Sequence, residues 1–112
     1  MENNNQPQPV LVGQGGPLNG FRWTISKTLL IGRTSSCDIS IANQQVSRKH
    51  AKIESSANGP VLEDLGSKNG TLINYSSMKK KVLQPGDKII LGRIILKFEH
   101  RDLAEQKFFD EI

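Results

Sequence analysis

The 112-residue chain has one cysteine, Cys37, and two histidines, so it offers too few ligands for a metal cluster. A lone cysteine cannot form an internal disulfide, which favours a reducing, cytoplasmic location. No apolar run approaches the ~20 residues of a membrane-spanning helix, and the N-terminus lacks the basic and apolar regions of a secretory signal. We therefore expect no metal, no other cofactor and no membrane span.

Aromatic residues are also scarce, at 5% of the chain. Proteins that bind nucleic acid by stacking bases need exposed aromatic side chains, and here most of the few aromatics fall at strand positions that look buried. The formal charge of +4 is uneven, because residues 99–112 hold two basic and five acidic residues and residues 1–98 therefore carry +7. A basic domain favours an anionic partner. A nucleic-acid-binding β-barrel, supported by the lysines at 79–81, stays open as a remote alternative.

Short apolar or alternating runs recur along the chain with turn residues between them. The runs span residues 10–13, 21–26, 28–32, 38–41, 51–55, 60–65, 71–74, 80–83, 87–92 and 93–98. Such short runs, separated by Asn-Gly and Pro-Gly turns, predict an all-β sandwich. Within one of them, Phe21, Trp23 and Ile25 alternate with polar residues, which predicts a strand with one buried face.

The two ends of the chain differ from this middle part. Residues 1–9 are Asn, Gln and Pro with a Met and a Glu, so we expect a mobile leader followed by a folded domain at 10–98. From residue 99 onward the pattern changes, because Asp102 can cap a helix and Ala104, Phe108 and Ile112 share one helical face. We expect a short C-terminal helix over 99–112 that leads into an effector domain.

Three clusters in the expected turns carry the chemistry. They are Gly32-Arg33, Ser47-Arg48-Lys49-His50 and Ser67-Lys68-Asn69-Gly70-Thr71. Together they offer guanidinium groups, a hydroxyl, a carboxamide and backbone N–H groups, the donors that a phosphate dianion recruits. Any one of them is what the surface loops of a basic sandwich contain anyway. The combination indicates an anion site.

In their order and spacing these clusters resemble the signature of the forkhead-associated (FHA) domain, which has Gly-Arg, then Ser-x-x-His, then Asn-Gly. Flanking segments extend the resemblance over about residues 10–98: CDISI, VSRKHAKI, LEDLGSKNGTLIN, LQPGDKIILG and IILKF. The resemblance implies a β-sandwich of about eleven short strands that binds phosphothreonine in an extended peptide and is not an enzyme. A Ser-x-x-Lys match at 76–79 has no catalytic partner motif, so we regard it as a chance match.

The resemblance implies a role for each matching residue. Arg33 would hold the phosphate, because its planar, always charged fork suits a phosphate. Ser47 would donate its hydroxyl, Arg48 would add a second charge, and Lys68 would face the phosphate from the neighbouring loop. Asn69 would bond the peptide backbone beside the phosphothreonine.

Five further residues would support the binding loops: Gly32, His50, Ser67, Gly70 and Thr71. In the family the histidine is structural, and a packed Cys37 is a simpler interpretation than a Cys-His dyad. Gln44 and Gln45 precede the Ser-Arg-Lys-His cluster, at positions where the resemblance implies tuning of the preference for residues after the phosphothreonine. One departure concerns the turn after 71–73, where Asn74-Tyr75 replaces the usual Asn-Gly, so we expect a longer or differently shaped turn.

The resemblance also suggests partners: a phosphothreonine-containing protein and the serine/threonine kinase that phosphorylates it. The tail at 99–112 resembles the linker between bacterial FHA domains and diguanylate cyclase (GGDEF) domains, which suggests regulation of cyclic-di-GMP synthesis. A third interpretation keeps the fold without the ligand, as a phosphorylation-independent scaffold or dimerisation unit. The intact set of donors argues against that alternative.

Overall fold

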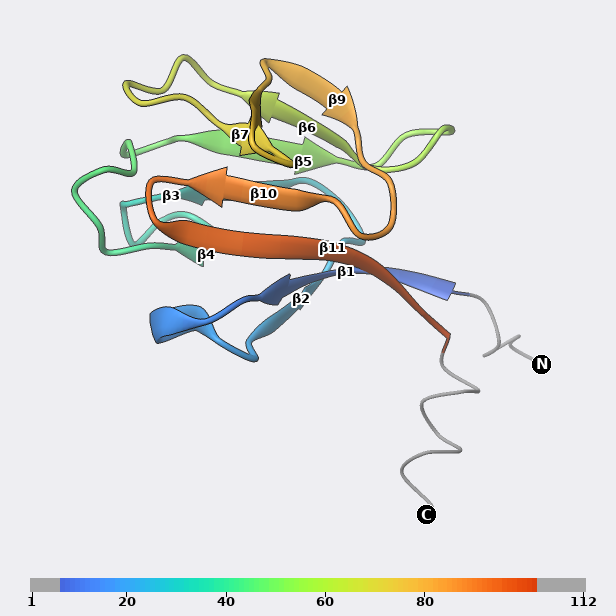
Figure 1. Ribbon diagram of the computed structural model, residues 1–112. Coiled ribbons are helices and arrows are strands. Elements are labelled where there is room, and N and C mark those ends of the chain that lie inside the picture. Colours follow the sequence, from blue (N-terminus) through green and yellow to red (C-terminus); the bar gives the residue numbers. More distant parts are fainter. Residues whose placement is uncertain (1–6, 103–112) are drawn as a thin grey trace.

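The computed structural model describes residues 7–102, which form a sandwich of two β-sheets (Figure 1). The elements are β1 (Pro7–Gly13), the 3₁₀ turn η1 (Gly16–Leu18), β2 (Arg22–Thr24), β3 (Leu29–Gly32), β4 (Ile39–Ser40), β5 (Ala51–Glu54), β6 (Val61–Asp64), β7 (Leu72–Ile73), β8 (Ser76–Ser77), β9 (Lys80–Val82), β10 (Lys88–Leu91) and β11 (Ile94–Asp102). The predicted all-β sandwich of about eleven strands is confirmed. No helix in this range is long and apolar enough to cross a membrane.

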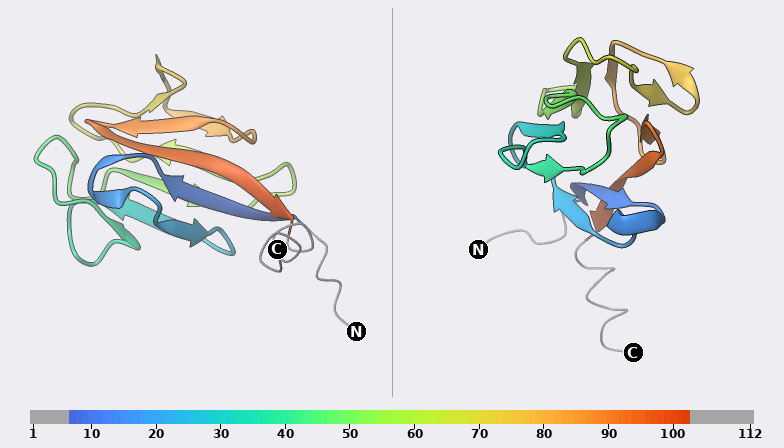
Figure 2. Two further views of the ribbon diagram at one scale, coloured as in Figure 1. Left: turned by 60° about the horizontal axis from the view of Figure 1, so that its bottom comes forward. Right: turned by 90° about the vertical axis from the view of Figure 1, so that its left-hand side faces the viewer.

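The strands form a six-stranded sheet in the order β2-β1-β11-β10-β7-β8 and a five-stranded sheet in the order β4-β3-β5-β6-β9. The views in Figure 2 show the two layers facing each other. Neighbouring strands are antiparallel except for β3 and β4, which run parallel. Because the chain crosses between the layers, loops from both sheets gather at one end of the sandwich.

The ladder between β1 and β11 extends past both expected ends of the domain. Its register runs from Pro7↔Asp102 to Gly13↔Leu96. Residues 7–9 are therefore strand where we expected a leader, and residues 99–102 are strand where we expected a helix. An antiparallel partner supplies backbone hydrogen bonds that local composition does not reveal. The rest of the expected helix, residues 103–112, lies outside the described residues.

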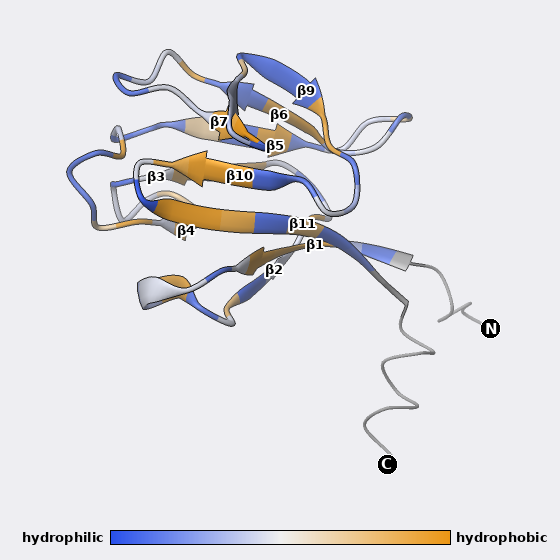
Figure 3. Cartoon of the chain, viewed as in Figure 1, coloured by the Kyte–Doolittle hydropathy of each residue, from blue (hydrophilic) through white to orange (hydrophobic). Residues whose placement is uncertain are grey.

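The core lies between the two sheets and is almost entirely aliphatic. Its fully buried members include Leu11, Ile31, Ile53, Leu62, Ile89, Leu91, Leu96 and Phe98. Figure 3 shows the same contrast, with hydrophobic segments along β10 and β11 and hydrophilic ones in the loops. Cys37 is buried, as expected for a packed residue.

The prediction that Phe21 faces the core is wrong. Phe21 is 56% exposed, because β2 begins one residue later and the Phe21 N–H closes a turn onto the carbonyl of Leu18. Phe21 instead lies edge-on against Trp23, with the ring centroids 6.1 Å apart. Trp23 is partly buried and packs against the core.

The turn after β7 is also tighter than expected. β7 and β8 pair through Ile73↔Ser76, so the Asn74-Tyr75 turn contains only two residues. Both have positive φ, 53° and 72°, as a type I′ turn requires. Asn74 is held from both sides of its amide, since its Nδ2 donates to Asp87 at 2.9 Å and its Oδ1 accepts the Lys88 N–H at 3.0 Å. The side-chain amide thus fixes a two-residue turn where the missing glycine led us to expect a longer or differently shaped one.

Candidate anion-binding site

Three loops meet at one end of the sandwich, at the left in Figure 1 and facing the viewer in the right-hand panel of Figure 2. They are the β3–β4 loop (33–38), the β4–β5 loop (41–50) and the β6–β7 loop (65–71). The Arg33 N–H donates to the Ser47 carbonyl at 3.0 Å, and the Lys68 N–H donates to Ser47 Oγ at 3.0 Å. The structure therefore brings Arg33, Ser47, Arg48, Lys68 and Asn69 together.

Arg33 follows the last residue of β3 and is exposed. Its Nε donates to the Val46 carbonyl at 3.0 Å, which fixes the direction of the guanidinium but uses only one of its five N–H groups. Gly32 makes this position possible, because a Cβ there would lie 2.1 Å from the Arg48 carbonyl oxygen and 2.8 Å from Cys37 Sγ. The glycine thus allows the β4–β5 loop to pack directly on the end of β3.

Ser47 lies at the centre of the three loops. Its N–H donates to His50 Nδ1 at 3.1 Å, and its carbonyl and Oγ accept the N–H groups of Arg33 and Lys68. Since the Oγ acts only as an acceptor in these contacts, its proton is free to donate outward. The Ser47 hydroxyl is therefore held in place and still available to an anion.

His50 is fully buried between the β4–β5 and β6–β7 loops. Because Nδ1 accepts the Ser47 N–H, the ring proton is on Nε2, which donates to the Gly70 carbonyl at 2.9 Å. Both ring nitrogens are thus occupied by backbone groups. This geometry bridges the two loops and gives the imidazole no access to a substrate.

Asp64, the last residue of β6, organises the β6–β7 loop, and we did not single it out in the sequence. Its Oδ1 accepts the N–H groups of Gly66 and Ser67 at 2.9 and 2.8 Å, while its Oδ2 accepts the hydroxyls of Ser67 and Thr71 at 2.6 and 2.7 Å. Burial raises the pKa of Asp64, but these four hydrogen bonds outweigh it and hold the pKa below its usual value of 3.8. The signal in the sequence was an Asp placed two residues before Gly-Ser, the spacing of an Asx turn.

The loop held by Asp64 presents Lys68 and Asn69 to solvent. Ser67 Oγ also accepts the Gly70 N–H at 2.9 Å, and Gly70 has φ of 82°, which suits glycine. Asn69 Nδ2 donates to the Gln45 carbonyl at 2.9 Å. Within the described residues, the second amide proton and the side-chain oxygen of Asn69 have no hydrogen-bond partner.

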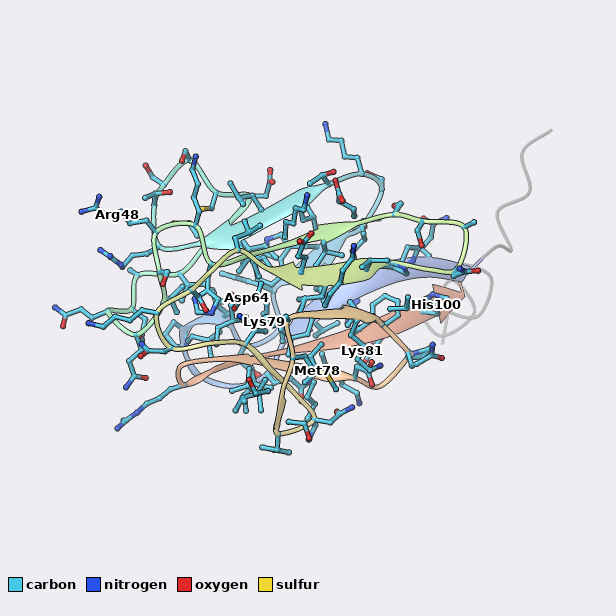
Figure 4. All side chains as sticks on the ribbon, turned by 90° about the horizontal axis from the view of Figure 1, so that it is seen from above. Arg48, Asp64, Met78, Lys79, Lys81 and His100 are labelled. Atoms are coloured by element: carbon cyan, nitrogen blue, oxygen red, sulfur yellow. The ribbon has the colours of Figure 1, made fainter. Side chains whose placement is uncertain are left out.

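The electrostatics of this end favour an anion. Arg33, Arg48 and Lys68 are exposed, and within the described residues none of them forms a salt bridge. Figure 4 shows Arg48 at the outer edge of the molecule, at the opposite end from His100. Asp64 lies nearby, but both of its oxygens accept hydrogen bonds from its own loop. Among the described residues, these three cations are therefore positive charges without a carboxylate partner.

A sequence model of the FHA domain matches residues 29–92. The oxoglutarate dehydrogenase inhibitor of Corynebacterium efficiens is 36% identical over 90 residues, which are 80% of this chain and 63% of that protein. The glycogen accumulation regulator GarA of Mycobacterium tuberculosis is 33% identical over 90 residues, 80% of this chain and 56% of that protein. The chain thus spans less than two thirds of the length of these relatives.

Solved structures show the same similarity. One, from a structural and functional analysis of phosphothreonine-dependent FHA domain interactions, superimposes with a TM-score of 0.77 at 27% identity. The superposition covers 86% of this chain and 99% of that one. The order of the motifs, the two-sheet sandwich and these matches agree, and the chain belongs to the FHA domain family.

Proposed function

We propose that this chain is a phosphothreonine-dependent peptide-binding module that recruits or senses a phosphorylated partner in serine/threonine kinase signalling. The observation that carries the proposal is the exposed, carboxylate-free cluster of Arg33, Ser47, Arg48 and Lys68 on loops that hydrogen-bond one another. The phosphothreonine-dependent interactions named for a structural relative support it. The function is binding, and we assign no catalytic residue.

The phosphate would be bound mainly by charge. A phosphothreonine carries about −1.5 to −2 at neutral pH and three acceptor oxygens. Arg33 has free guanidinium protons for a bidentate contact, Ser47 has a free hydroxyl proton, and the ammonium group of Lys68 and the guanidinium of Arg48 supply further charge. Because backbone bonds already fix the loops, binding would order little more than the long side chains.

The rest of the ligand would be an extended peptide. Asn69 has a free amide proton and a free carbonyl oxygen, which together match one peptide unit of an extended strand. Preference for threonine over serine would rest on the γ-methyl group. One buried methyl is worth about 1 kcal/mol, or about fivefold in affinity, so discrimination would be incomplete.

The partners, location and effector of this module depend on more than the described residues. The kinase, the phosphorylated partner, a cytoplasmic location and a regulated diguanylate cyclase stay predictions, and the named relatives point to inhibition and regulation of other proteins. A scaffold that ignores phosphorylation is the alternative, and it predicts no difference between phosphorylated and unphosphorylated peptides.

Calorimetric titration with a degenerate phosphothreonine peptide pool tests the proposal, with unphosphorylated and phosphoserine pools as controls. We expect binding to the phosphothreonine pool, and a loss of at least about a hundredfold in Arg33→Ala, since contacts to a charged group contribute about 1.5–3 kcal/mol each. The matched variant Arg22→Ala, on β2, should bind like the wild type. Equal affinity of Arg33→Ala and wild type would overturn the site, and no binding by a folded wild type would favour the scaffold.

A further inference from the structure

A cavity of about 620 Å³ lies beside the binding loops and shares none of the proposed phosphate ligands. Three segments form it: residues 14–18 around η1, residues 40–43 at the end of β4, and residues 93–94 after β10. These segments lie at the loop end of the sandwich (Figure 2, right). Its volume falls within the range of about 300–1,000 Å³ that is usual for ligand sites. We name this cavity the η1 groove.

The η1 groove has a defined chemical character. Its apolar side chains are Pro17, Leu18, Ile41, Ala42 and Ile94. Arg93 also lines it, is exposed, and makes no salt bridge or side-chain hydrogen bond within the described residues. Among the described residues, none that lines the groove carries a carboxylate. The groove therefore suits an aliphatic side chain that lies next to an acidic one.

One wall of the η1 groove follows directly on a sheet edge. β4 is the outermost strand of the five-stranded sheet and pairs only with β3. Ala42, two residues after β4, is exposed, and its backbone makes no hydrogen bond within the described residues. An unpaired backbone beside an edge strand favours the binding of an extended peptide, which can hydrogen-bond both the N–H and the carbonyl group.

The groove and the proposed phosphate site are built on the same loop. Asn43 lines the groove, while Ser47, four residues later, belongs to the proposed phosphate site. Between them Gln45 packs on the β10–β11 turn so tightly that a Cβ on Gly92 would lie 2.8 Å from Gln45 Cβ. Since an extended chain advances about 3.3 Å per residue, a peptide anchored at Ser47 reaches past this contact within a short segment.

We infer that the η1 groove binds a second segment of the same phosphorylated partner, an extended stretch with an aliphatic residue beside an acidic one. The inference rests on the proposed function, because the phosphothreonine supplies the anchor. Once the phosphothreonine is bound, the second contact is intramolecular, so even a weak contact in the η1 groove raises the overall affinity. Burial of one aliphatic side chain corresponds to about tenfold or more in affinity. Ordering of the segment removes part of that gain, so we expect at least about fivefold.

Two peptide libraries with a fixed phosphothreonine test the inference. One has about four degenerate residues on each side, and the other has about twelve, which extend about 40 Å. We expect wild-type protein to enrich an aliphatic and acidic pair at a fixed distance from the phosphothreonine in the long library only. The selected peptides and their truncated cores are then compared by calorimetry on wild type, Arg93→Glu, Ala42→Trp and the charge-matched control Arg22→Glu.

The outcomes separate the two proposals. Arg93→Glu and Ala42→Trp should bind the long peptides no more tightly than the truncated core peptides, and should bind the core peptides as tightly as wild type does. Arg22→Glu should still bind the long peptides more tightly than the core peptides. No enrichment outside the core, or a full gain in both groove variants, would overturn the groove while leaving the phosphate site in place. If folded wild type captures neither library, the proposed function fails and the groove inference falls with it.

Discussion

The substitution Asp64→Asn tests whether one carboxylate holds the β6–β7 loop in its binding conformation. The amide keeps an oxygen for the N–H groups of Gly66 and Ser67, but it places a donor where Oδ2 accepts the hydroxyls of Ser67 and Thr71. Hydrogen bonds to charged groups contribute about 1.5–3 kcal/mol each. The carboxylate is only 9% exposed, so water screens it little. Allowing for rotation of the hydroxyls, we expect a loss of about 2–3 kcal/mol in unfolding free energy.

The pH dependence of this loss follows from the lowered pKa of Asp64. A carboxyl group whose pKa is lower in the folded state binds fewer protons there, so its stabilising effect is complete above its usual pKa of 3.8 and disappears as the pH falls through the folded value. The difference between wild type and Asp64→Asn should therefore shrink on acidification. Asp87, whose pKa is also lowered, is present in both proteins and cancels in the comparison.

Urea denaturation at about pH 7 and at about pH 3 measures this difference. Glu63→Gln is the matched control, because its carboxylate is 40% exposed and its nearest cation, Lys52, is 3.9 Å away. Such surface pairs contribute less than about 1 kcal/mol. Phosphopeptide affinity should fall in Asp64→Asn and stay constant in Glu63→Gln. A loss below about 0.5 kcal/mol at neutral pH, or one that does not shrink in acid, would refute the role assigned to Asp64.

Two further substitutions test individual positions of the fold. Gly32→Ala should destabilise the domain by about 1–3 kcal/mol and weaken phosphopeptide binding, because its Cβ would lie 2.1 Å from the Arg48 carbonyl oxygen. Thermal unfolding and calorimetry check both effects, and unchanged binding would show that the β4–β5 loop moves without cost. Tyr75→Gly should stabilise the domain by about 0.5 kcal/mol in urea denaturation, because Tyr75 has φ of 72°. A destabilisation instead would mean that its exposed ring contributes packing.

The sequence predicted the fold well because its signals are local. Each of the ten apolar runs overlaps a strand, and the turn residues between them mark where the strands end. The failures come from contacts between distant parts of the chain. Strand pairing at residues 7–9 and 99–102 depends on the opposite end of the chain, which local composition cannot show. Likewise, the tight Asn74-Tyr75 turn depends on hydrogen bonds to Asp87 and Lys88.

The residues proposed to bind the ligand were also predicted from the sequence, but the hydrogen bonds that hold their loops in place were not. Asp64 precedes the loop that it organises and looked like an ordinary strand residue. The bond between Asn69 and the Gln45 carbonyl joins loops 24 residues apart in the sequence. Motifs of short spacing reveal exposed groups in single loops, whereas the bonds between loops appear only when the chain is folded.

At the loop end of the sandwich, the residues that support the loops differ from those proposed to bind an anion. The ring nitrogens of His50 and the carboxylate oxygens of Asp64 all make hydrogen bonds to the loops, so both side chains fix the loops and have no group left for a ligand. The side chains of Arg33 and Ser47 each make one hydrogen bond to the loops, through Nε and Oγ, and their other side-chain N–H and O–H groups are left for the proposed anion. Changes at the first pair should therefore lower stability and affinity together. Removal of the Arg33 guanidinium should lower affinity far more than stability, since the group is exposed and the backbone bond of Arg33 to Ser47 remains.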